Sequence, residues 1–252
     1  IIMGRLFYFY KKEEVIMRRI SYIITSLIMV FSMATITAFA KPDWPIDTGI
    51  QSEAGIVMDM DSGAILYGQN IHLTYPPASI TKILTALIVL ENCNLDDTVT
   101  FSTTAVNQVE ADSGNKISVV AGDELSVEDC LYSLLLVSCN QAANALAEHT
   151  AGSIPAFVDM MNEKLAELGC QESHFANPSG LNDDTQRTSA YDMALIARAA
   201  FQNQQLLEIS STRKASIPPT INNPDGRTFS MEHKLLITED GSSEEYYPDA
   251  VA

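Results

Sequence analysis

The sequence is poor in positive charge: 15 lysines and arginines stand against 32 aspartates and glutamates, for a formal net charge of −17. A protein with this excess of negative charge repels the phosphate backbone of a nucleic acid, and we therefore expect no nucleic-acid partner. Histidine is scarce too, with four residues and neither a His-Glu-x-x-His motif nor a paired ligand spacing. We therefore expect no metal site.

A Gly-x-Ser-x-Gly elbow is absent, and no histidine has an evident serine partner, which argues against a Ser-His-Asp hydrolase. Cysteine is limited to Cys93, Cys130, Cys139 and Cys170. Four cysteines allow three disulfide connectivities, and their spacing selects none of them. Because three of the four lie in or beside apolar helical stretches, buried free thiols are at least as good an interpretation.

The N-terminal part of the chain has a composition of its own. After Met17 come two arginines, an uncharged run over residues 20–40 and the ending Ala-Phe-Ala, a pattern typical of a signal peptide. We interpret residues 17–40 as a signal peptide cleaved after Ala40, and residues 1–16 as an upstream extension that is not native. The alternative is a retained membrane anchor, since the run is long enough to span a bilayer. Both interpretations predict an exported protein.

After a linker at residues 41–52, the chain from residue 53 to 252 predicts one domain of mixed structure. Two hairpins are predicted, the first over residues 54–67 around Asp-Ser-Gly and the second over residues 213–231 around Asn-Pro-Asp-Gly. Between them, apolar periodicity predicts a series of helices, which begin at Ser79, Ser126, Gln141, Pro155 and Ala190. The order of strands, helices and strands predicts an α+β fold, with the helices on one side of a sheet.

The helix predicted over residues 79–91 carries the first candidate site, and we expect its apolar face to pack on the first hairpin. Two consecutive prolines precede it and mark its start. Ser79 and Lys82 lie one turn apart on one face, and the helix N-terminus lowers the pKa of a nearby ammonium. A serine beside a neutral lysine is an activated nucleophile. The alternative is an ordinary N-cap serine, and Ser211 begins a second Ser-x-x-Lys tetrad.

The second candidate is the Ser-Cys-Asn triplet at residues 138–140, where an apolar leucine run ends and another helix begins. Polar side chains at such a junction must find hydrogen-bond partners. Ser138 and Asn140 therefore either take part in a site or cap the next helix. A similar triplet, Ser-Gly-Asn, begins at Ser113.

With two further segments, these motifs resemble the serine D-Ala-D-Ala carboxypeptidases, the low-molecular-mass penicillin-binding proteins of bacterial cell walls. The four segments follow the family's order with comparable spacings, and read Pro-Ala-Ser79-Ile-Thr-Lys82, Ser138-Cys-Asn140, His174-Phe-x-Asn177-Pro-x-Gly180-Leu181 and Ser189-Ala-Tyr-Asp192-Met-Ala194. The resemblance covers most of residues 54–252 and selects Ser79 over Ser211 and Ser138 over Ser113. It implies a penicilloyl-serine-transferase fold, with an antiparallel sheet, a mainly helical part and the site between them.

The resemblance also implies roles for individual residues. Ser79 would attack the carbonyl between the two terminal D-alanines of a peptidoglycan stem peptide, and Lys82 would take its proton. Ser138 would relay a proton to the departing D-alanine, and Asn140 would bind the substrate amide. The backbone N–H of Ser79 would supply one oxyanion donor.

Two further substrate-binding residues, Gly180 and Leu181, are implied by the third segment. The implied partners are stem peptides ending in D-Ala-D-Ala and β-lactam antibiotics, which would acylate the serine as substrate mimics. No cofactor is needed. The implied location is the cell wall or the outer face of the cytoplasmic membrane.

The sequence departs from the family in two ways. The family's Lys-Thr-Gly motif, on a sheet strand, is absent, and Arg187 stands where many relatives have histidine. We therefore expect a domain that is incomplete at its C-terminus, without the last central strands or a C-terminal membrane-anchoring segment. Because loss of one oxyanion donor costs about a hundred- to a thousandfold in rate, we expect low activity from this chain.

Other functions on the same fold stay open. A class A β-lactamase would need a Glu-x-x-x-Asn segment, and residues 165–177 contain Glu167 and Glu172 without that pattern. An endopeptidase that cuts cross-links differs little from a carboxypeptidase at this level. A non-catalytic wall-binding protein would keep the cleft without the chemistry.

Overall fold

The computed structural model describes residues 17–22, 24, 25, 50–109, 114 and 116–232. The chain divides into two units, Ile1–Gly49 and Ile50–Ala252. In the first unit residues 17–22, 24 and 25 are helical and exposed. The rest of the predicted signal peptide, residues 1–16 and residues 41–49 of the linker lie outside the described residues. Within the described ranges, no helix has both the length and the apolar composition that a membrane crossing requires.

The second unit begins with the predicted hairpin, formed by β1 (Gly55–Met58) and β2 (Ile65–Gln69) in antiparallel pairing. Its turn includes Gly63, whose φ of +71° favours glycine. Helix α7 (Ala190–Phe201) contacts β1, and Arg198 on α7 donates to the carbonyls of the turn. The prediction that the Ser79 helix packs on this hairpin is therefore wrong, because α7 occupies that position.

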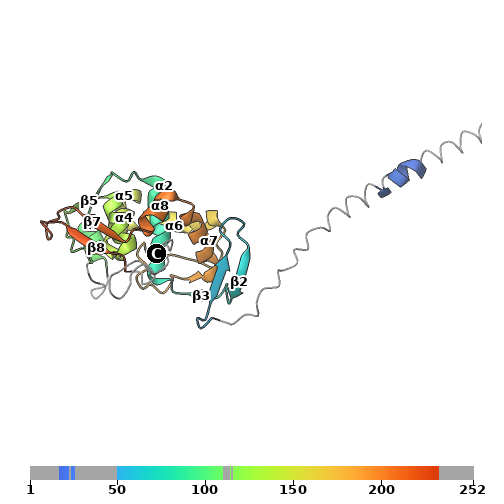
Figure 1. Cartoon of the computed structure of the whole chain (residues 1–252), viewed down its shortest axis with the longest axis horizontal. Helices are drawn as coiled ribbons and strands as arrows, with labels where there is room; N and C mark the ends of the chain where they lie inside the picture. Colours follow the sequence, from blue (N-terminus) through green and yellow to red (C-terminus); the bar gives the residue numbers. More distant parts are fainter. Residues whose placement is uncertain (1–16, 23, 26–49, 110–113, 115, 233–252) are drawn as a thin grey trace, which may run out of the picture. The chain divides into compact units, whose positions relative to one another are not determined.

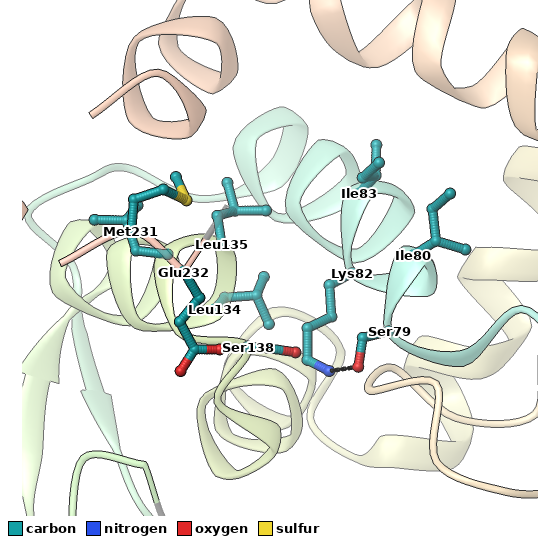
Figure 2. A pocket seen from close by; sticks show the side chains of 10 residues that line it. Ser79, Ile80, Lys82, Ile83, Leu134, Leu135, Ser138, Met231 and Glu232 are labelled. Atoms are coloured by element: carbon teal, nitrogen blue, oxygen red, sulfur yellow. Dashed lines mark hydrogen bonds between the residues drawn. The ribbon is translucent and has the colours of Figure 1, made fainter. Parts of the chain in front are cut away.

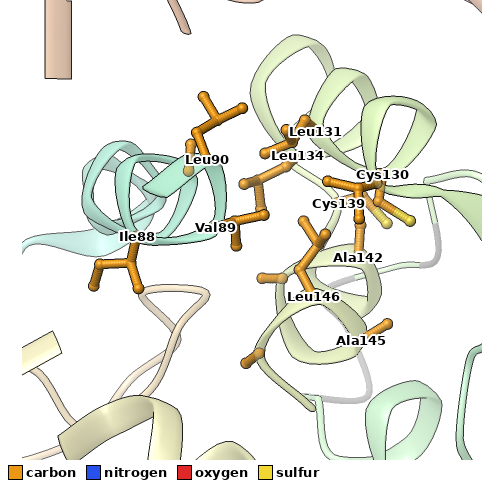
Figure 3. Close-up of a cluster of buried hydrophobic side chains, with 14 of the residues drawn as sticks. Ile88, Val89, Leu90, Cys130, Leu131, Leu134, Cys139, Ala142, Ala145 and Leu146 are labelled. Atoms are coloured by element: carbon orange, nitrogen blue, oxygen red, sulfur yellow. The ribbon is translucent and has the colours of Figure 1, made fainter. Parts of the chain in front are cut away.

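A helix buried on almost every side forms the centre of this unit. It is α2 (Lys82–Asn92), which packs against α4 (Val127–Leu136), α5 (Asn140–Ala151), α6 (Ile154–Leu168), α7 and α8 (Gln204–Ser210). In Figure 1 it lies between the β1–β2 hairpin at one end and the second hairpin at the other. Figure 3 shows Val89 and Leu90 facing leucines of α4 and α5. Burial of both faces explains the nearly continuous apolar run of α2.

The helix ends follow the local signals of the sequence. Ser126, where the sequence predicts a helix to begin, forms a capping box with Asp129 at the start of α4. Gly152 and Gly169 end α5 and α6 in the left-handed conformation that glycine adopts without strain. Two short helices, α3 (Thr103–Asn107) and α8, were not predicted.

The strands are antiparallel, as predicted, but those in the described ranges form four separate pairs rather than one sheet. Besides β1 and β2, the pairs are β3 (Thr74–Tyr75) with β6 (Thr188–Ser189), β4 (Thr98–Thr100) with β5 (Glu124–Ser126), and β7 (Lys214–Ile217) with β8 (Arg227–Ser230). The last pair is the predicted second hairpin. The short strand β4 was not predicted. The α+β class is confirmed.

All four cysteines are free thiols. Cys130 and Cys139 are buried between α4 and α5 (Figure 3), and Cys93 and Cys170 are partly buried. Burial raises the pKa of the Cys139 thiol to about 11, so this thiol is protonated at neutral pH. Of the two interpretations of the cysteines, the structure shows the buried free thiols.

Candidate active site

Ser79 lies in a single 3₁₀ turn, η1 (Ala78–Thr81), that leads directly into α2. The buried Pro77 precedes the turn, and Ala78 has a φ of +51°. The Ser79 side chain is exposed. The regular helix thus begins at Lys82, three residues later than predicted, because the positive φ of Ala78 interrupts the helical path after Pro77 and the connection tightens into a 3₁₀ turn.

Lys82 is buried, with 3% of its surface exposed, and its ammonium has two oxygen partners. Its Nζ lies 3.1 Å from Ser79 Oγ and 2.6 Å from the carbonyl oxygen of Ser179. Burial lowers the pKa of Lys82 from 10.5 to about 8, since desolvation disfavours the charged form. The predicted pairing of hydroxyl and amine is present. An amine with this pKa can accept the hydroxyl proton near neutral pH.

Ser138 lies in the connection between α4 and α5, and its φ of +56° is unusual for a residue other than glycine. This conformation directs its hydroxyl toward Lys82 and Ser79 (Figure 2). Cys139, rather than Ser138 or Asn140, is the N-cap of α5, and it makes no side-chain capping bond. The capping interpretation of the triplet is therefore wrong. Ala78 and Ser138 are both strained and both adjoin Ser79 or Lys82, as is common at functional sites.

A cavity of about 350 Å³ opens beside these three side chains. Its walls are mostly apolar (Figure 2), and its lining comprises Ser79, Ile80, Lys82, Ile83, Leu134, Leu135, Leu136, Ser138, Met231 and Glu232. The Glu232 carboxylate pairs with Lys116 at 3.0 Å. The sequence carried no signal for Glu232 or the apolar wall, because these residues come from separate elements. The cavity has room for an acyl group beside the Ser79 hydroxyl.

The other predicted binding residues do not line this cavity in the described part of the chain. Asn140 is buried as the first residue of α5. Gly180 packs against η1, where an added Cβ would lie 1.9 Å from the carbonyl oxygen of Ala78. Leu181 lines a separate polar cavity of about 380 Å³. Gly180 thus lies directly against the turn that carries Ser79, and a substrate contact of Gly180 or Leu181 stays a prediction.

The side chains of the fourth segment, residues 189–194, stabilise the start of α7. Ser189 caps α7 by accepting a hydrogen bond from the Asp192 N–H. The fully buried Asp192 carboxylate accepts hydrogen bonds from Gln171 N–H, Glu172 N–H and Ser173 Oγ–H. Arg187 is exposed, and its guanidinium donates to a carbonyl two residues away.

The alternative motifs have no such geometry. Ser211 follows α8, and its hydroxyl donates to carbonyls of that helix, while Lys214 is exposed on β7. Ser113 lies outside the described residues. The structure therefore brings Ser79, Lys82 and Ser138 together and leaves the second Ser-x-x-Lys tetrad apart.

Comparisons with known proteins show the family of this chain. Residues 39–241 match the family model of D-alanyl-D-alanine carboxypeptidase, peptidase S11. The chain is 33% identical over 183 residues to the carboxypeptidase DacF of Bacillus subtilis, covering 70% of this chain and 46% of DacF. It is 37% identical over 179 residues to DacB2 of Mycobacterium tuberculosis, covering 70% of this chain and 58% of DacB2. The chain thus spans about half the length of these relatives.

A solved structure of a D-alanyl-D-alanine carboxypeptidase from Mycobacterium tuberculosis H37Rv has the same fold. It superposes with a TM-score of 0.69 at 33% identity, over 77% of this chain and 70% of that one. Relatives of similar identity also include D-alanyl-D-alanine endopeptidases.

Proposed function

The chain belongs to the D-alanyl-D-alanine carboxypeptidase family, and from this we propose a function. We propose that the protein is a serine hydrolase that removes the terminal D-alanine from peptidoglycan stem peptides. One observation carries the proposal: Lys82 Nζ lies 3.1 Å from Ser79 Oγ in a buried setting that lowers the pKa of the lysine to about 8. The same arrangement supports acylation of Ser79 by β-lactams.

The first half of the reaction forms an acyl-enzyme. Uncharged Lys82 accepts the hydroxyl proton of Ser79, and the Ser79 Oγ attacks the carbonyl between the two D-alanines. The first-turn N–H of Ser79 has no acceptor within its own turn and can donate to the developing oxyanion. As the C–N bond breaks, Ser138 gives its hydroxyl proton to the amine of the leaving D-alanine and takes a proton from the Lys82 ammonium, which leaves Lys82 uncharged again.

The second half releases the shortened peptide. Lys82 accepts a proton from a water molecule, and the resulting hydroxide attacks the ester carbonyl. As the bond between the carbonyl carbon and Ser79 Oγ breaks, Lys82 returns the proton to Oγ and the Ser79 hydroxyl is restored. In this proposal Asn140 hydrogen-bonds the substrate amide, a role that requires its buried side chain to reach the cavity. These steps need only side chains, backbone and water.

The structure favours a peptidase over a class A β-lactamase. Glu167 pairs with Lys164, and Glu172 contacts His72 and Ser189. Neither glutamate lines the Ser79 cavity, so neither is placed to activate a deacylating water. An endopeptidase remains the second candidate, because it uses the same acyl-enzyme chemistry and some relatives bear that name.

The location is part of the proposal. We propose export directed by residues 17–40 and action outside the cytoplasm, in the cell wall or on the outer face of the membrane. The N-terminal pattern of the sequence supports this. N-terminal sequencing of secreted protein should find a start at Lys41, and an intact Met17 there would refute cleavage.

The central test is covalent labelling by a fluorescent penicillin, followed by intact mass and peptide mapping. We expect one adduct on the Ser79 peptide of the wild-type chain and of Ser211→Ala, the matched variant of the second tetrad. Ser79→Ala should carry none. Labelling should be slow because the sequence has no Lys-Thr-Gly motif. Equal labelling of Ser79→Ala would refute the proposal, and rapid stoichiometric labelling would refute the expected low activity.

A second assay separates the two peptidase functions. The chain is incubated with a linear pentapeptide ending in D-Ala-D-Ala and, separately, with a cross-linked dimer. A carboxypeptidase releases free D-alanine from the pentapeptide, whereas an endopeptidase cleaves the dimer. Peptide binding by Ser79→Ala, without any acylation of the wild type, would identify a non-catalytic wall-binding protein.

A further inference from the structure

The Asn177 carboxamide holds together the loop that follows Phe175. Its Oδ1 accepts hydrogen bonds from Gly180 N–H at 2.8 Å, Leu181 N–H at 3.1 Å and Ser179 Oγ–H at 3.1 Å. Its Nδ2 donates to the Leu181 carbonyl at 2.9 Å. One side chain thus satisfies four polar groups of residues 179–181, so it determines where the backbone of this loop lies.

The same loop contacts α2 and η1 through three consecutive residues. The Pro178 carbonyl accepts from Thr85 Oγ1 at 2.7 Å, and the Ser179 carbonyl accepts from Lys82 Nζ at 2.6 Å. Gly180, at φ +82°, packs against the Ala78 carbonyl. Thr85 and Lys82 lie three residues apart on one face of α2, so the loop runs along that face and reaches η1.

We propose that Asn177 is a positioning residue for the reaction: it fixes the Ser179 carbonyl, which in turn holds Lys82 Nζ against Ser79 Oγ. This inference rests on the proposed function. It assigns a role to a residue of the third segment that does not touch the Ser79 cavity within the described part of the chain.

The Ser179 carbonyl suits this task because it can only accept. An uncharged amine has two N–H donors and one lone pair. While one N–H donates to Ser179, the lone pair is free to receive the Ser79 proton. After the transfer, the ammonium keeps the same bond to Ser179. The anchor therefore holds Nζ in place through both protonation states, on a side chain that otherwise has four freely rotating bonds.

Loss of the Asn177 carboxamide should act on Lys82 through this carbonyl. Residues 179–181 keep only the weaker bond from Leu181 N–H to Ser179 Oγ and the bond from Gln186 Nε2–H to the Leu181 carbonyl. The Ser179 carbonyl then moves away and water reaches Nζ. Hydration favours the ammonium, so the pKa of Lys82 should rise toward its ordinary value. A smaller fraction of Lys82 is then uncharged at neutral pH.

The test compares Asn177→Ala with Asn162→Ala. Asn162 is a matched control because its carboxamide ties the same loop to α6, accepting from Phe175 N–H and donating to the Phe175 carbonyl. It makes no hydrogen bond to residues 178–181. Two properties are measured for each full chain: the pKa of Lys82 by NMR of ¹³Cε-labelled lysine, assigned with Lys82→Met, and the pH profile of penicillin acylation.

We expect Asn177→Ala to raise the Lys82 pKa by about one unit, move the acid limb of acylation equally, and slow acylation at pH 7 by about tenfold. Asn162→Ala should lower the melting temperature and leave the lysine pKa and the pH profile unchanged. The inference is overturned if Asn177→Ala leaves the lysine pKa and the pH profile unchanged. It is also overturned if Asn177→Ala and Asn162→Ala shift these two properties equally.

A second variant covers the case in which Asn177→Ala does not fold. Thr85→Val removes the bond from Thr85 Oγ1 to the Pro178 carbonyl with little change of volume. It should shift the lysine pKa in the same direction by a smaller amount, and no shift would overturn the inference. The NMR measurement needs no catalysis. If the wild-type chain is not acylated, the proposed function is contradicted, but the lysine pKa still decides whether Asn177 positions Lys82.

Discussion

At the scale of a single residue, burial of Lys82 lowers its pKa and so makes it a base near neutral pH. Its Nζ has two oxygen partners, and its charged form is disfavoured because the side chain is withdrawn from water. Each pH unit between 8 and 10.5 corresponds to about 1.4 kcal/mol, so the buried ammonium costs the fold about 3 kcal/mol. The property that supports proton transfer therefore lowers stability.

Replacing Lys82 by methionine should stabilise the chain at pH 7 by about 1–3 kcal/mol, since the ammonium cost disappears and two hydrogen bonds are lost. The folded-state pKa is lower than the unfolded one, so the cost is complete below pH 8 and fades as the pH rises to 10.5. The gain should therefore vanish by about pH 10.5. Urea unfolding at several pH values measures it.

Lys164→Met is the control for this prediction. Lys164 pairs with Glu91 and Glu167, which raise its pKa, so its removal should stabilise the chain at no pH. A pH-independent gain for Lys82→Met would show that the lysine is not charged at a cost in the folded chain.

Acylation should follow the ionisation of the same lysine. Only uncharged Lys82 accepts the Ser79 proton, so the rate of penicillin acylation should rise with pH up to about 8 and then level off. Well below pH 8 it should fall about tenfold per pH unit. Stopped-time fluorescence labelling between pH 6 and 9 measures this profile. A flat profile would exclude Lys82 as the base.

At the scale of elements, the site depends on how closely the loop of residues 177–181 approaches η1. Gly180 has a φ of +82°, and the space where a Cβ would lie is filled by the Ala78 carbonyl. Glycine is needed there for both its conformation and its lack of a side chain. The turn that presents Ser79 is thus shaped from behind by a loop about a hundred residues further along the chain.

Gly180→Ala should lower acylation at least tenfold, because the added methyl must displace the turn that carries Ser79. The control is Gly152→Ala: its φ of +79° gives similar backbone strain, but no atom lies within 4 Å of the added Cβ. Gly152→Ala should lose about 1–2 kcal/mol of stability from backbone strain alone. Gly180→Ala should lose more because of the added clash, and only Gly180→Ala should lose acylation. Equal acylation rates for Gly180→Ala and Gly152→Ala would show that the contact between Gly180 and the Ala78 carbonyl does not matter for acylation.

Over the whole molecule, the β7–β8 hairpin is joined to the helical part through the segment at residues 116–123. Asn223 donates to the Ile117 carbonyl, and Arg227 donates to Ser118. The buried Asp123 carboxylate accepts from Ile221 N–H at 2.7 Å and Val120 N–H at 2.8 Å. These bonds hold the hairpin, and with it Met231 and Glu232 in the lining of the cavity.

Asp123→Ala should destabilise the chain by about 2–4 kcal/mol, because two N–H groups lose their acceptor where water has little access. Urea unfolding measures the loss. The control is Asp183→Ala: the Asp183 carboxylate also accepts two hydrogen bonds, both from Thr185, but it is exposed. Water replaces it there, so the loss of stability should be much smaller than for Asp123→Ala. Similar losses would contradict the importance of burial.

Much of the secondary structure was predictable because its signals are local. The capping box at Ser126, the stop glycines at residues 152 and 169, and the turn residues of both hairpins act within a few residues of chain. Short elements such as α3, α8 and β4 escaped prediction because they span too few residues to show a period. The pairing of β3 with β6 and of β4 with β5 escaped it as well, since these pairs join segments that are distant in the chain.

The sequence by itself determined that Ser79 and Lys82 share one face at the start of a helix, since three residues of helical chain impose that spacing. Tertiary structure decided the rest. Lys82 is buried and meets Ser179, 97 residues away, only because α2 lies at the centre of the helical body. The lowered pKa, the approach of Ser138 and the support from Asn177 all follow from that packing, because desolvation and contacts between distant segments exist only in the folded chain.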